Sequence, residues 1–340
     1  MKQAIIEAKK TKGFHLPNPP VGAIIVKDNK IIGSGYHAKF GFAHAEINAM
    51  KNAKKNGHSV ENADIYITLQ PCSKHGQTGA CLNEIIKNKF KKVIIGSIDK
   101  SDKDSIKLLR QKGIEVELIE DTTETDELIK IFNWNIESNK PYVYGKIAIS
   151  KDGYSATNTK QQWITSKASR NNGRILRTKV QAILVGSRTI INDNPLLNSR
   201  IEGYRNPDII IIDPKLKISK KTNIFKSNVK KYIFINENTK ISKYPNTEFI
   251  KLKESKISTN TILDELYKRG IKSILVEGGM NTLKTFIIEK NINVLYKYQS
   301  NKNLIQNGIN KFEDIKLLSS NIKYKKVDIE NDTLKIYEVK

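Results

Sequence analysis

The sequence predicts two successive domains of the α/β class, residues 1–140 and residues 141–340. Its 340 residues are more than one ordinary hydrophobic core holds, and they suit two domains of typical size. Strand-like and helix-like segments alternate in both halves, which is typical of layered α/β domains. A helical pattern stops at Lys140-Pro141, because a proline disfavours the helical conformation of the residue before it. We therefore place the domain boundary there.

The first domain begins with a short helix and a predicted hairpin. The β-branched runs at 21–27 and 30–36 are separated by Asp28-Asn29, a pair that suits a tight turn between antiparallel strands. The segment 44–55 then carries apolar residues at helical spacing. Further strands are expected at 64–69, 91–98 and 114–119, and an amphipathic helix that opens on a capping residue is expected at 123–139.

The second domain continues the alternation of strands and helices with a different apolar pattern, so we find no internal duplication. Its β-branched and apolar runs predict strands at 142–150, 182–186, 208–213, 231–236, 273–279 and 293–299. Helical spacing of apolar residues predicts helices at 166–177, 261–269 and 281–289. The tail from 301 onward carries no diagnostic pattern.

The charge balance is strongly basic. Lysine and arginine outnumber aspartate and glutamate by 59 to 35, which gives a formal net charge of +24. Such an excess favours phosphates, nucleic acid or an anionic membrane surface as partners. However, the basic residues are spread over stretches such as 51–56 and 215–231 and are not interleaved with stacking aromatic residues. We therefore interpret them as a solvated lysine-rich face and expect no nucleic-acid partner.

The sequence also predicts in which cellular compartment the protein is found. No apolar run approaches the roughly 20 residues that span a bilayer. The first 13 residues suggest an amphipathic helix rather than a secretory signal. We expect a cytoplasmic protein with no membrane partner. Two cysteines in the whole chain do not build a disulfide framework, and their neighbours indicate chemistry instead.

Four residues form the pattern of a catalytic metal site. His44 and Glu46 open a predicted helix, whereas Cys72 and Cys81 lie where the strand at 64–69 ends and the next helix begins. One imidazole and two thiolates leave the fourth tetrahedral position of Zn²⁺ free for water, as in catalytic rather than structural zinc sites. A helix N-terminus also favours the thiolate form of a cysteine. We predict His44, Cys72 and Cys81 as zinc ligands.

Glu46 is the predicted catalytic residue. Zinc lowers the pKa of its bound water to about 7, and a carboxyl group two residues beyond a ligand can move a proton from that water to the leaving amine. Zinc deaminases use this arrangement with two residues between the cysteines, whereas eight separate them here. Taken alone, His44 equally suits the role of a core histidine, and each cysteine suits that of a small buried apolar residue. Together, in this order, they indicate hydrolytic removal of an exocyclic amine from a nucleobase-like ring.

Four motifs of the first half carry a family resemblance: PNPPVGA (17–23), GYH (35–37), HAE (44–46) and PCSKHGQTGAC (71–81). Together they resemble the bifunctional riboflavin-biosynthesis deaminase/reductase family, in which the long spacing between the cysteines is characteristic. The tRNA adenosine and cytidine deaminases share the fold and the zinc chemistry but have closely spaced cysteines. The resemblance implies a cytidine-deaminase-like α/β/α domain. It further implies a pocket for a pyrimidine and its ribose phosphate that is lined by Asn18, His37, Lys74 and His75.

The turn at 277–279 follows a predicted strand and precedes a predicted helix, so its backbone N–H groups could hold a phosphate. By itself this pattern equally suits a plain tight turn. However, the second half also carries KIAIS (146–150), WIT (163–165), AILVG (182–186), DNP (193–195) and LVEGG (275–279) in that order. These segments resemble the reductase half of the same family, which implies a dihydrofolate-reductase-like α/β domain.

The resemblance assigns two sets of contacts in the second domain. Contacts to the cofactor NADPH are expected from Ala148, Trp163, Thr189, Asp193, Gly279, Met280, Asn281, Thr282, Leu283, Lys284 and Thr285. Contacts to the phosphorylated pyrimidine are expected from Lys146, Gln161, Arg177, Leu197, Arg200 and Glu277. The cations in the second set suit an anionic substrate, and two of them are arginines that can grip a phosphate through two hydrogen bonds.

The leading hypothesis is therefore a bifunctional enzyme of riboflavin biosynthesis. It would deaminate 2,5-diamino-6-ribosylamino-4(3H)-pyrimidinone 5′-phosphate with zinc and then reduce the ribosyl group with NADPH, and the resemblance implies a homodimer or larger homo-oligomer. A nucleic-acid deaminase with an accessory domain is one alternative, although it predicts closely spaced cysteines and an RNA-binding module. A basic two-domain binding protein with a structural zinc is the other, although such a site normally has four protein ligands.

Overall fold

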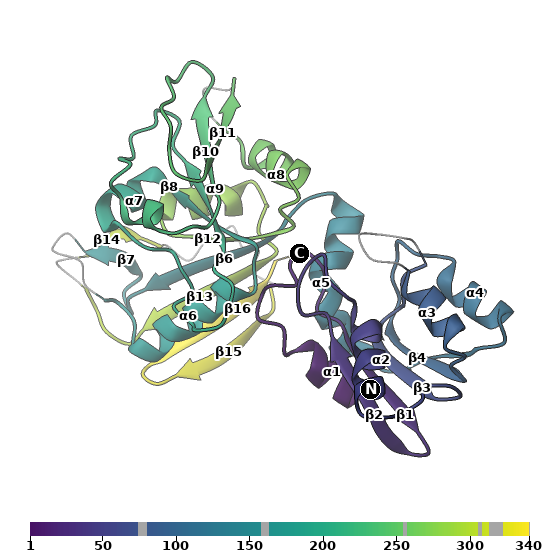
Figure 1. Ribbon diagram of the computed structural model, residues 1–340. Coiled ribbons are helices and arrows are strands. Elements are labelled where there is room, and N and C mark those ends of the chain that lie inside the picture. The colour runs from purple at the N-terminus through teal and green to yellow at the C-terminus, as the bar shows by residue number, and fades with distance from the viewer. Residues whose placement is uncertain (74–79, 158–162, 254–256, 305–307, 313–321, 340) are drawn as a thin grey trace. The chain divides into compact units, whose positions relative to one another are not determined.

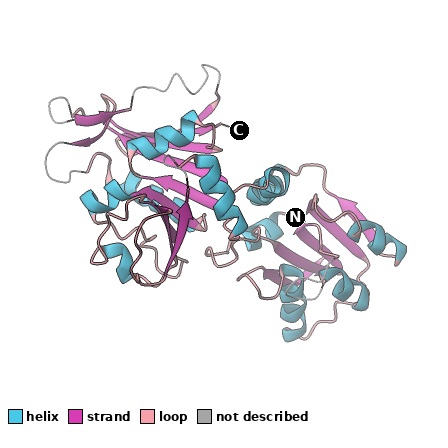
Figure 2. Cartoon of the chain, turned by 90° about the horizontal axis from the view of Figure 1, so that it is seen from above, coloured by secondary structure: helices cyan, strands magenta, loops and turns pink. Residues whose placement is uncertain are grey.

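The computed structural model describes residues 1–73, 80–157, 163–253, 257–304, 308–312 and 322–339 (Figure 1). The chain divides into two compact units, Met1–Asn139 and Lys140–Lys340. In each unit, strands form a central sheet and helices flank it (Figure 2). Among the described residues, no helix has both the length and the apolar character that crossing a bilayer requires.

The first unit is built on a five-stranded sheet in the order β2-β1-β3-β4-β5. Asp28 and Asn29 both adopt positive φ (50° and 59°), as a tight hairpin turn requires, so the predicted hairpin is confirmed. β1 is antiparallel to β2 and β3, whereas β3, β4 and β5 run parallel. The strands are β1 (Gly22–Lys27), β2 (Lys30–Tyr36), β3 (Asp64–Leu69), β4 (Lys92–Ser97) and β5 (Glu115–Leu118).

Helices cover both faces of this sheet. They are α1 (Lys2–Ala8), α2 (Ala45–Lys55), α3 (Cys81–Lys87), α4 (Ser105–Gln111) and α5 (Thr123–Ser138). Glycine lets α2 lie directly against β2, because a Cβ on Gly35 would stand 2.3 Å from the amide nitrogen of Ala49. Apolar residues of α2, α3 and α4 share one core with the sheet, whereas α1 and α5 lie on its other face. The start of α2 is thereby fixed over the end of the sheet.

The predicted cap of α5 needs a correction. The helix was expected to open on Thr123 as its capping residue, but Thr123 already belongs to α5, and the side chain of the residue before it, Thr122, makes no capping hydrogen bond. Instead, the carboxylate of Asp121 accepts from the backbone N–H of Thr123 at 3.0 Å. An acidic side chain suits this position because it also faces the positive end of the helix dipole.

The second unit contains a nine-stranded sheet in the order β11-β10-β9-β8-β12-β6-β13-β16-β15. The seven strands from β11 to β13 are parallel, and β16 and β15 add an antiparallel edge. They are β6 (Tyr142–Ile149), β8 (Ala182–Gly186), β9 (Asp208–Ile212), β10 (Lys231–Asn236), β11 (Thr247–Leu252), β12 (Ser273–Glu277), β13 (Val294–Ser300), β15 (Tyr324–Ile329) and β16 (Asp332–Glu338). A separate pair joins β7 (Tyr154–Thr157) to β14 (Gly308–Lys311).

Helices again lie on both faces of the larger sheet. They are α6 (Lys167–Thr178), α7 (Ser187–Asp193), the 3₁₀ helix η1 (Asn223–Lys226), α8 (Thr259–Lys268) and α9 (Met280–Ile288). Consecutive residues of β6 point to opposite faces of the sheet. A Cβ on Gly145 would meet Leu283 of α9, whereas Lys146 lies against Gly173 of α6. The apolar side chains of α8 and α9 form the main core with the sheet. The face under α6 therefore carries the charged groups.

Candidate functional site

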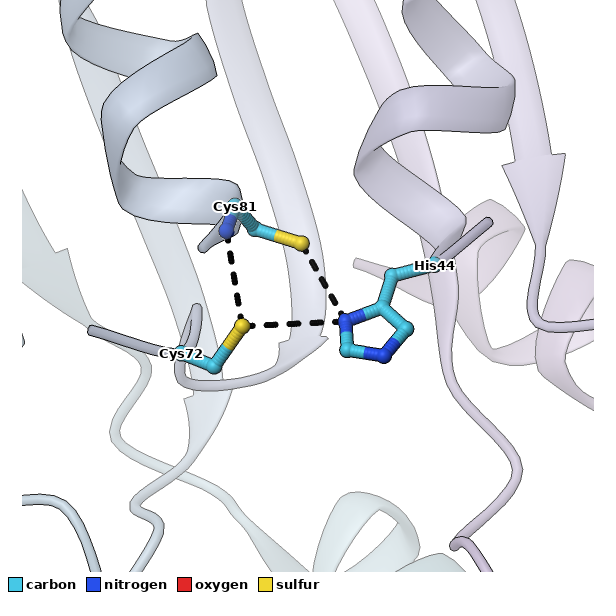
Figure 3. A group of neighbouring side chains, drawn as sticks. All are labelled: His44, Cys72 and Cys81. Carbon is cyan, nitrogen blue, oxygen red and sulfur yellow. Dashed lines mark hydrogen bonds between the residues drawn. The ribbon is translucent and has the colours of Figure 1, made fainter. Parts of the chain in front are cut away.

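The first unit brings the three predicted zinc ligands together at one end of its sheet. His44 immediately precedes α2, Cys72 lies in the loop after β3, and Cys81 is the first residue of α3. The Nδ1 atom of His44 lies 3.2 Å from the Sγ of Cys81 and 3.7 Å from the Sγ of Cys72 (Figure 3). All three donor atoms lie within 4.8 Å of one another. Distances of this size between donor atoms suit a tetrahedral zinc site with two Zn–S bonds and one Zn–N bond.

Without a metal ion, only one of the three side chains, Cys72, has its pKa shifted toward the form that binds zinc, whereas the pKa values of His44 and Cys81 are raised. A hydrogen bond from Cys81 and further ones from His44 and the backbone lower the pKa of Cys72 to about 4, so this thiol is ionised at neutral pH. The hydrogen bond to Cys72, together with burial, raises the pKa of Cys81. A bound dication favours the thiolate form of both cysteines, and the proton of Cys81 leaves when zinc binds. The donor set therefore fits zinc.

Glu46 lies in the first turn of α2, is 3% exposed and lines a cavity of about 170 Å³ together with the ligands His44 and Cys72. Burial raises its pKa, because a low-dielectric surrounding disfavours the charged carboxylate. A carboxyl group with a raised pKa can exchange a proton near neutral pH. The cavity is lined by Asn18, Pro19, Val21, His37, His44, Glu46, Leu69, Gln70, Cys72, Asp99 and Phe132.

Two of the four predicted pyrimidine contacts reach this cavity. The Nδ1 atom of His37 lies 3.3 Å from the carbonyl oxygen of Ala43, and its Nε2 lies 3.1 Å from the amide nitrogen of Asn18. Because a carbonyl only accepts, Nδ1 carries the proton and Nε2 accepts from Asn18. Burial lowers the pKa of His37, which keeps the ring neutral. Lys74 and His75 lie outside the described residues.

In the second unit, three charged side chains from different elements meet at the end of β12. Arg177 of α6 donates to both carboxylate oxygens of Glu277, at 2.8 and 2.9 Å, and Lys146 of β6 donates at 3.3 Å. Burial raises the pKa of Glu277, but the charges and hydrogen bonds of Arg177 and Lys146 outweigh it and lower the pKa to about 2. The carboxylate thus holds two cations in place on the face under α6.

Further arginines gather around this group. Burial and the charges of Arg200, Arg177 and Arg170 lower the pKa of Arg174, which shows that four guanidinium groups share one region. The guanidinium of Arg170 also faces the exposed ring of Trp163, 4.5 Å from the ring centre. A surplus of cations around one buried carboxylate suits an anionic ligand such as a phosphate. The predicted contacts to the phosphorylated pyrimidine did not include Arg170 and Arg174.

A narrow cradle lies beside these cations at the ends of the adjacent strands β8 and β12. Gly278 and Gly279 adopt positive φ, 88° and 75°, and a Cβ on Gly278 would stand 2.9 Å from Thr189. A Cβ on Gly186 would likewise stand 2.9 Å from the hydroxyl of Thr282 in the first turn of α9. Such a strand-to-helix turn leaves backbone N–H groups at the helix N-terminus open to phosphate. The cradle therefore fits the pyrophosphate of a dinucleotide.

The other predicted contacts of the second unit lie on several elements. Leu197 is buried and Arg200 is exposed, and both adopt positive φ. Ala148 lies half-buried on β6, and the exposed Asp193 ends α7. Met280, Asn281, Leu283, Lys284 and Thr285 all lie in α9, after Gly279 as the residue before the helix. Gln161 lies outside the described residues.

Comparisons with known proteins give matches for both halves of the chain. The cytidine and deoxycytidylate deaminase zinc-binding region matches residues 1–97, and the RibD C-terminal domain matches residues 141–324. Riboflavin biosynthesis protein RibD of Aquifex aeolicus is 37% identical over 302 residues, which cover 85% of this chain and 82% of that protein. The chain belongs to the RibD family.

RibD of Bacillus amyloliquefaciens is 35% identical, with 84% of this chain and 80% of that protein covered. A diaminohydroxyphosphoribosylaminopyrimidine deaminase/5-amino-6-(5-phosphoribosylamino)uracil reductase from Thermotoga maritima has a similar crystal structure, with a TM-score of 0.88 and 32% identity over 99% of this chain and 97% of that one. As a RibD protein, the chain combines a zinc-dependent deaminase with a reductase in riboflavin biosynthesis. The expected cytidine-deaminase-like and dihydrofolate-reductase-like folds are confirmed, and the nucleic-acid deaminase is not favoured.

Sequence reasoning missed several residues of the RibD deaminase cavity. Gln70, Asp99 and Phe132 line it, although none belongs to the motifs that carry the resemblance. Gln70 precedes the PC motif, and Asp99 directly follows the strand pattern at 91–98, so both positions could have been suggested by their place at strand ends. Phe132 comes from the middle of α5, where no local signal distinguishes it from an ordinary apolar residue of the helix.

Proposed function

We propose that the first unit deaminates 2,5-diamino-6-ribosylamino-4(3H)-pyrimidinone 5′-phosphate and that the second reduces the ribosyl group of the product to ribityl with NADPH. The observation that carries this proposal is the group of His44, Cys72 and Cys81 next to the buried carboxyl of Glu46. Three ligands and a nearby proton carrier suit hydrolysis of an amine, whereas a structural zinc site would use a fourth protein ligand.

In the deaminase, Glu46 moves the protons. The bound zinc supplies a water whose lowered pKa makes it a nucleophile at neutral pH. Glu46 would take one proton from this water and give it to the ring nitrogen, and it would carry the second proton, from the hydroxyl then bound to the ring carbon, to the departing ammonia, which leaves a carbonyl in place of the amine. Its raised pKa supports this role, because a carboxyl group transfers protons best when its pKa is near the working pH.

The rest of the deaminase cavity orients the ring. The neutral His37 and the amide of Asn18 form a hydrogen-bonded pair at its wall, which supports their assignment to the pyrimidine. Lys74 and His75 supply positive charge and hydrogen-bond donors for the ribose phosphate. Because both ring nitrogens of His37 already have protein partners, the ring would act by fixing the amide of Asn18 at the wall of the cavity.

In the reductase, Arg177, Arg200 and Lys146 hold the phosphorylated pyrimidine. NADPH supplies the hydride, and the turn at 278–279 with the first turns of α9 holds its pyrophosphate. Lys146 is a proton donor candidate, because its ammonium group lies on the face that carries the arginines and is held there by Glu277. Asp193 is the other candidate for the proton donor. If a Lys146→Ala variant reduced the substrate at the wild-type rate, Lys146 would be excluded as the donor.

The two activities can be tested separately in the full chain. Purified protein is incubated with the diaminopyrimidinone phosphate, with and without NADPH, while ammonia release and NADPH oxidation are followed in parallel. We expect ammonia under both conditions and NADPH oxidation only after deamination. Ammonia release without NADPH oxidation would refute the reductase assignment, and NADPH oxidation only with externally supplied deaminated substrate would refute the deaminase assignment.

We further propose, on family membership alone, a cytoplasmic homodimer or larger homo-oligomer. Light scattering on the purified protein across a range of concentrations measures the mass directly. A mass equal to one chain at all concentrations would contradict the proposed assembly.

A further inference from the structure

Of the three zinc ligands, Cys72 has the least support from secondary structure. His44 adjoins α2 and Cys81 begins α3, whereas Cys72 lies in neither a helix nor a strand. A metal site requires each donor atom to be held close to its place in the tetrahedron, so the loop around Cys72 needs other restraints. The nearest ones are the backbone N–H of Leu82, which donates to the carbonyl of Cys72 at 3.2 Å, and that of Cys81, which donates to its Sγ at 3.4 Å.

A buried carboxylate holds the residue that follows Cys72. Asp102 is 5% exposed and lies between β4 and α4. Its Oδ2 accepts from the backbone N–H of Ser73 at 2.6 Å, and its Oδ1 accepts from the Ser73 hydroxyl at 2.8 Å. Hydrogen bonds to an ionised acceptor are about twice as strong as those between neutral groups. The backbone and the side chain of Ser73 are thus bound to one group.

The carboxylate is itself firmly anchored. Oδ1 of Asp102 also accepts from the backbone N–H groups of Asp104 and Ser105, at 3.2 and 3.3 Å, where α4 begins. Leu109 of α4 is fully buried in the core of the first unit. Burial raises the pKa of a carboxyl group, but the hydrogen bonds from Ser73, Asp104 and Ser105 outweigh it and lower the pKa of Asp102. Asp102 is therefore an ionised, acceptor-only group tied to the core.

The same segment also holds the chain before Cys72. The side-chain amide of Gln70 donates to the backbone oxygen of Asp102 at 2.6 Å and to the hydroxyl of Ser105 at 2.8 Å. The backbone N–H of Gln70 donates to Ser97 at the end of β4. Cys72 thus lies between two residues, both of which are bound to the segment 102–105.

We propose that Asp102 is a positioning residue for the zinc ligand Cys72, and that it fixes the thiolate by binding Ser73 while its backbone binds Gln70. The proposal rests on the zinc site of the proposed function. Without the carboxylate, the N–H of Ser73 loses its acceptor and the loop gains freedom that zinc binding must then restrict. Zinc affinity should fall, because the loss of a residue that orients a metal ligand typically weakens metal binding by about 10- to 100-fold.

The test measures zinc affinity directly. Full-length protein is stripped of metal and titrated with Zn²⁺ in competition with a chromophoric chelator. For Asp102→Ala we expect binding weaker by about 10- to 100-fold, and for Asp102→Asn a smaller loss, because one acceptor oxygen remains. Asp104→Asn is the matched control: Asp104 lies two residues away, is exposed, and its side chain makes no capping hydrogen bond to α4, so the zinc affinity of this variant should stay within about twofold of wild type.

Three readouts separate a positioning role of Asp102 from a general loss of structure. Co²⁺ replaces zinc as a probe, and its thiolate charge-transfer band should shift in the Asp102 variants but not in Asp104→Asn. Ammonia release should recover in excess zinc, whereas a misfolded first unit would stay inactive at any zinc concentration. The reductase activity of the same samples, with deaminated substrate, reports whether the second unit is intact and should equal that of wild type.

Ser73→Ala supplies a milder variant should Asp102→Ala not fold. It removes only the hydroxyl contact, so a measurable loss of zinc affinity is expected, and its effect should not add to that of Asp102→Asn. Wild-type zinc affinity in both Asp102→Asn and Ser73→Ala would overturn the inference and leave the proposed function standing. A wild-type protein that binds no zinc would instead overturn the proposed function.

Discussion

Replacing Glu277 by glutamine should destabilise the second unit by about 3 kcal/mol at neutral pH. The side chain is 11% exposed and makes three hydrogen bonds to Arg177 and Lys146. A carboxyl pKa that is lowered from 4.5 to about 2 corresponds to roughly 3 kcal/mol of stabilisation of the folded state. This magnitude agrees with the roughly 3–5 kcal/mol that is lost when one partner of a buried ion pair is removed.

The pH dependence follows from the sign of this shift. Because folding lowers the pKa of Glu277, its contribution is complete above pH 4.5 and disappears as the pH falls toward 2. The free energies of unfolding of wild type and Glu277→Gln should therefore differ most above about pH 5 and converge near pH 2. This convergence at low pH distinguishes loss of the carboxylate charge from loss of packing, because a loss of packing would lower the free energy of unfolding equally at every pH.

Urea unfolding provides the assay. The chain has two tryptophans, Trp134 in the first unit and Trp163 in the second, so in Trp134→Phe the tryptophan fluorescence, excited selectively at long wavelength, comes from the second unit alone. Glu248→Gln is the matched control: its carboxylate pairs with Arg269 at 2.6 Å but is 34% exposed, and such pairs contribute only about 0–1 kcal/mol. A loss for Glu277→Gln no larger than that of the control would refute the reasoning.

Three further substitutions test the geometry. Gly35→Ala places a Cβ 2.3 Å from the backbone of Ala49 and should lower the unfolding free energy of the first unit by about 1–3 kcal/mol in urea; an unchanged midpoint would contradict the close approach of β2 and α2. Gly278→Ala, at φ 88° and against Thr189, should weaken NADPH binding about tenfold in a fluorescence titration, and unchanged affinity would refute the cradle. Cys81→Ser should lose bound zinc and ammonia release together, as metal analysis and an ammonia assay would show; retained zinc would exclude Cys81 as a ligand.

Much of the fold could be predicted from local patterns. Asp28-Asn29 specified the hairpin because both residues tolerate positive φ, and the β-branched runs of the buried parallel strands were unambiguous. β15 and β16 could not be located within the tail, because β15 is the exposed edge strand of the sheet and both strands carry lysine and aspartate where a buried strand would be apolar. α7 was missed because it has only seven residues, among them the β-branched Thr189 and two isoleucines.

The residues of the candidate sites also fall into those that local patterns reveal and those that depend on distant parts of the chain. The zinc ligands lie next to the ends of recognisable elements, so their motifs were visible in the sequence. Asp102 could not be assigned, because its role depends on Ser73, 29 positions away, and on the packing of α4. The contact between Arg177 and Glu277 spans 100 positions and depends on how α6 lies over the sheet. The family resemblance assigned each residue to the substrate but did not predict that they pair with each other.

The central claim is that the buried carboxyl beside the zinc ligands carries the protons of deamination, while reduction proceeds at a separate site. It is tested most directly with Glu46→Gln, which nearly preserves the size of the side chain. The account predicts that this variant still binds zinc and still oxidises NADPH when given deaminated substrate, but releases no ammonia from the diaminopyrimidinone phosphate. Ammonia release at the wild-type rate would contradict it.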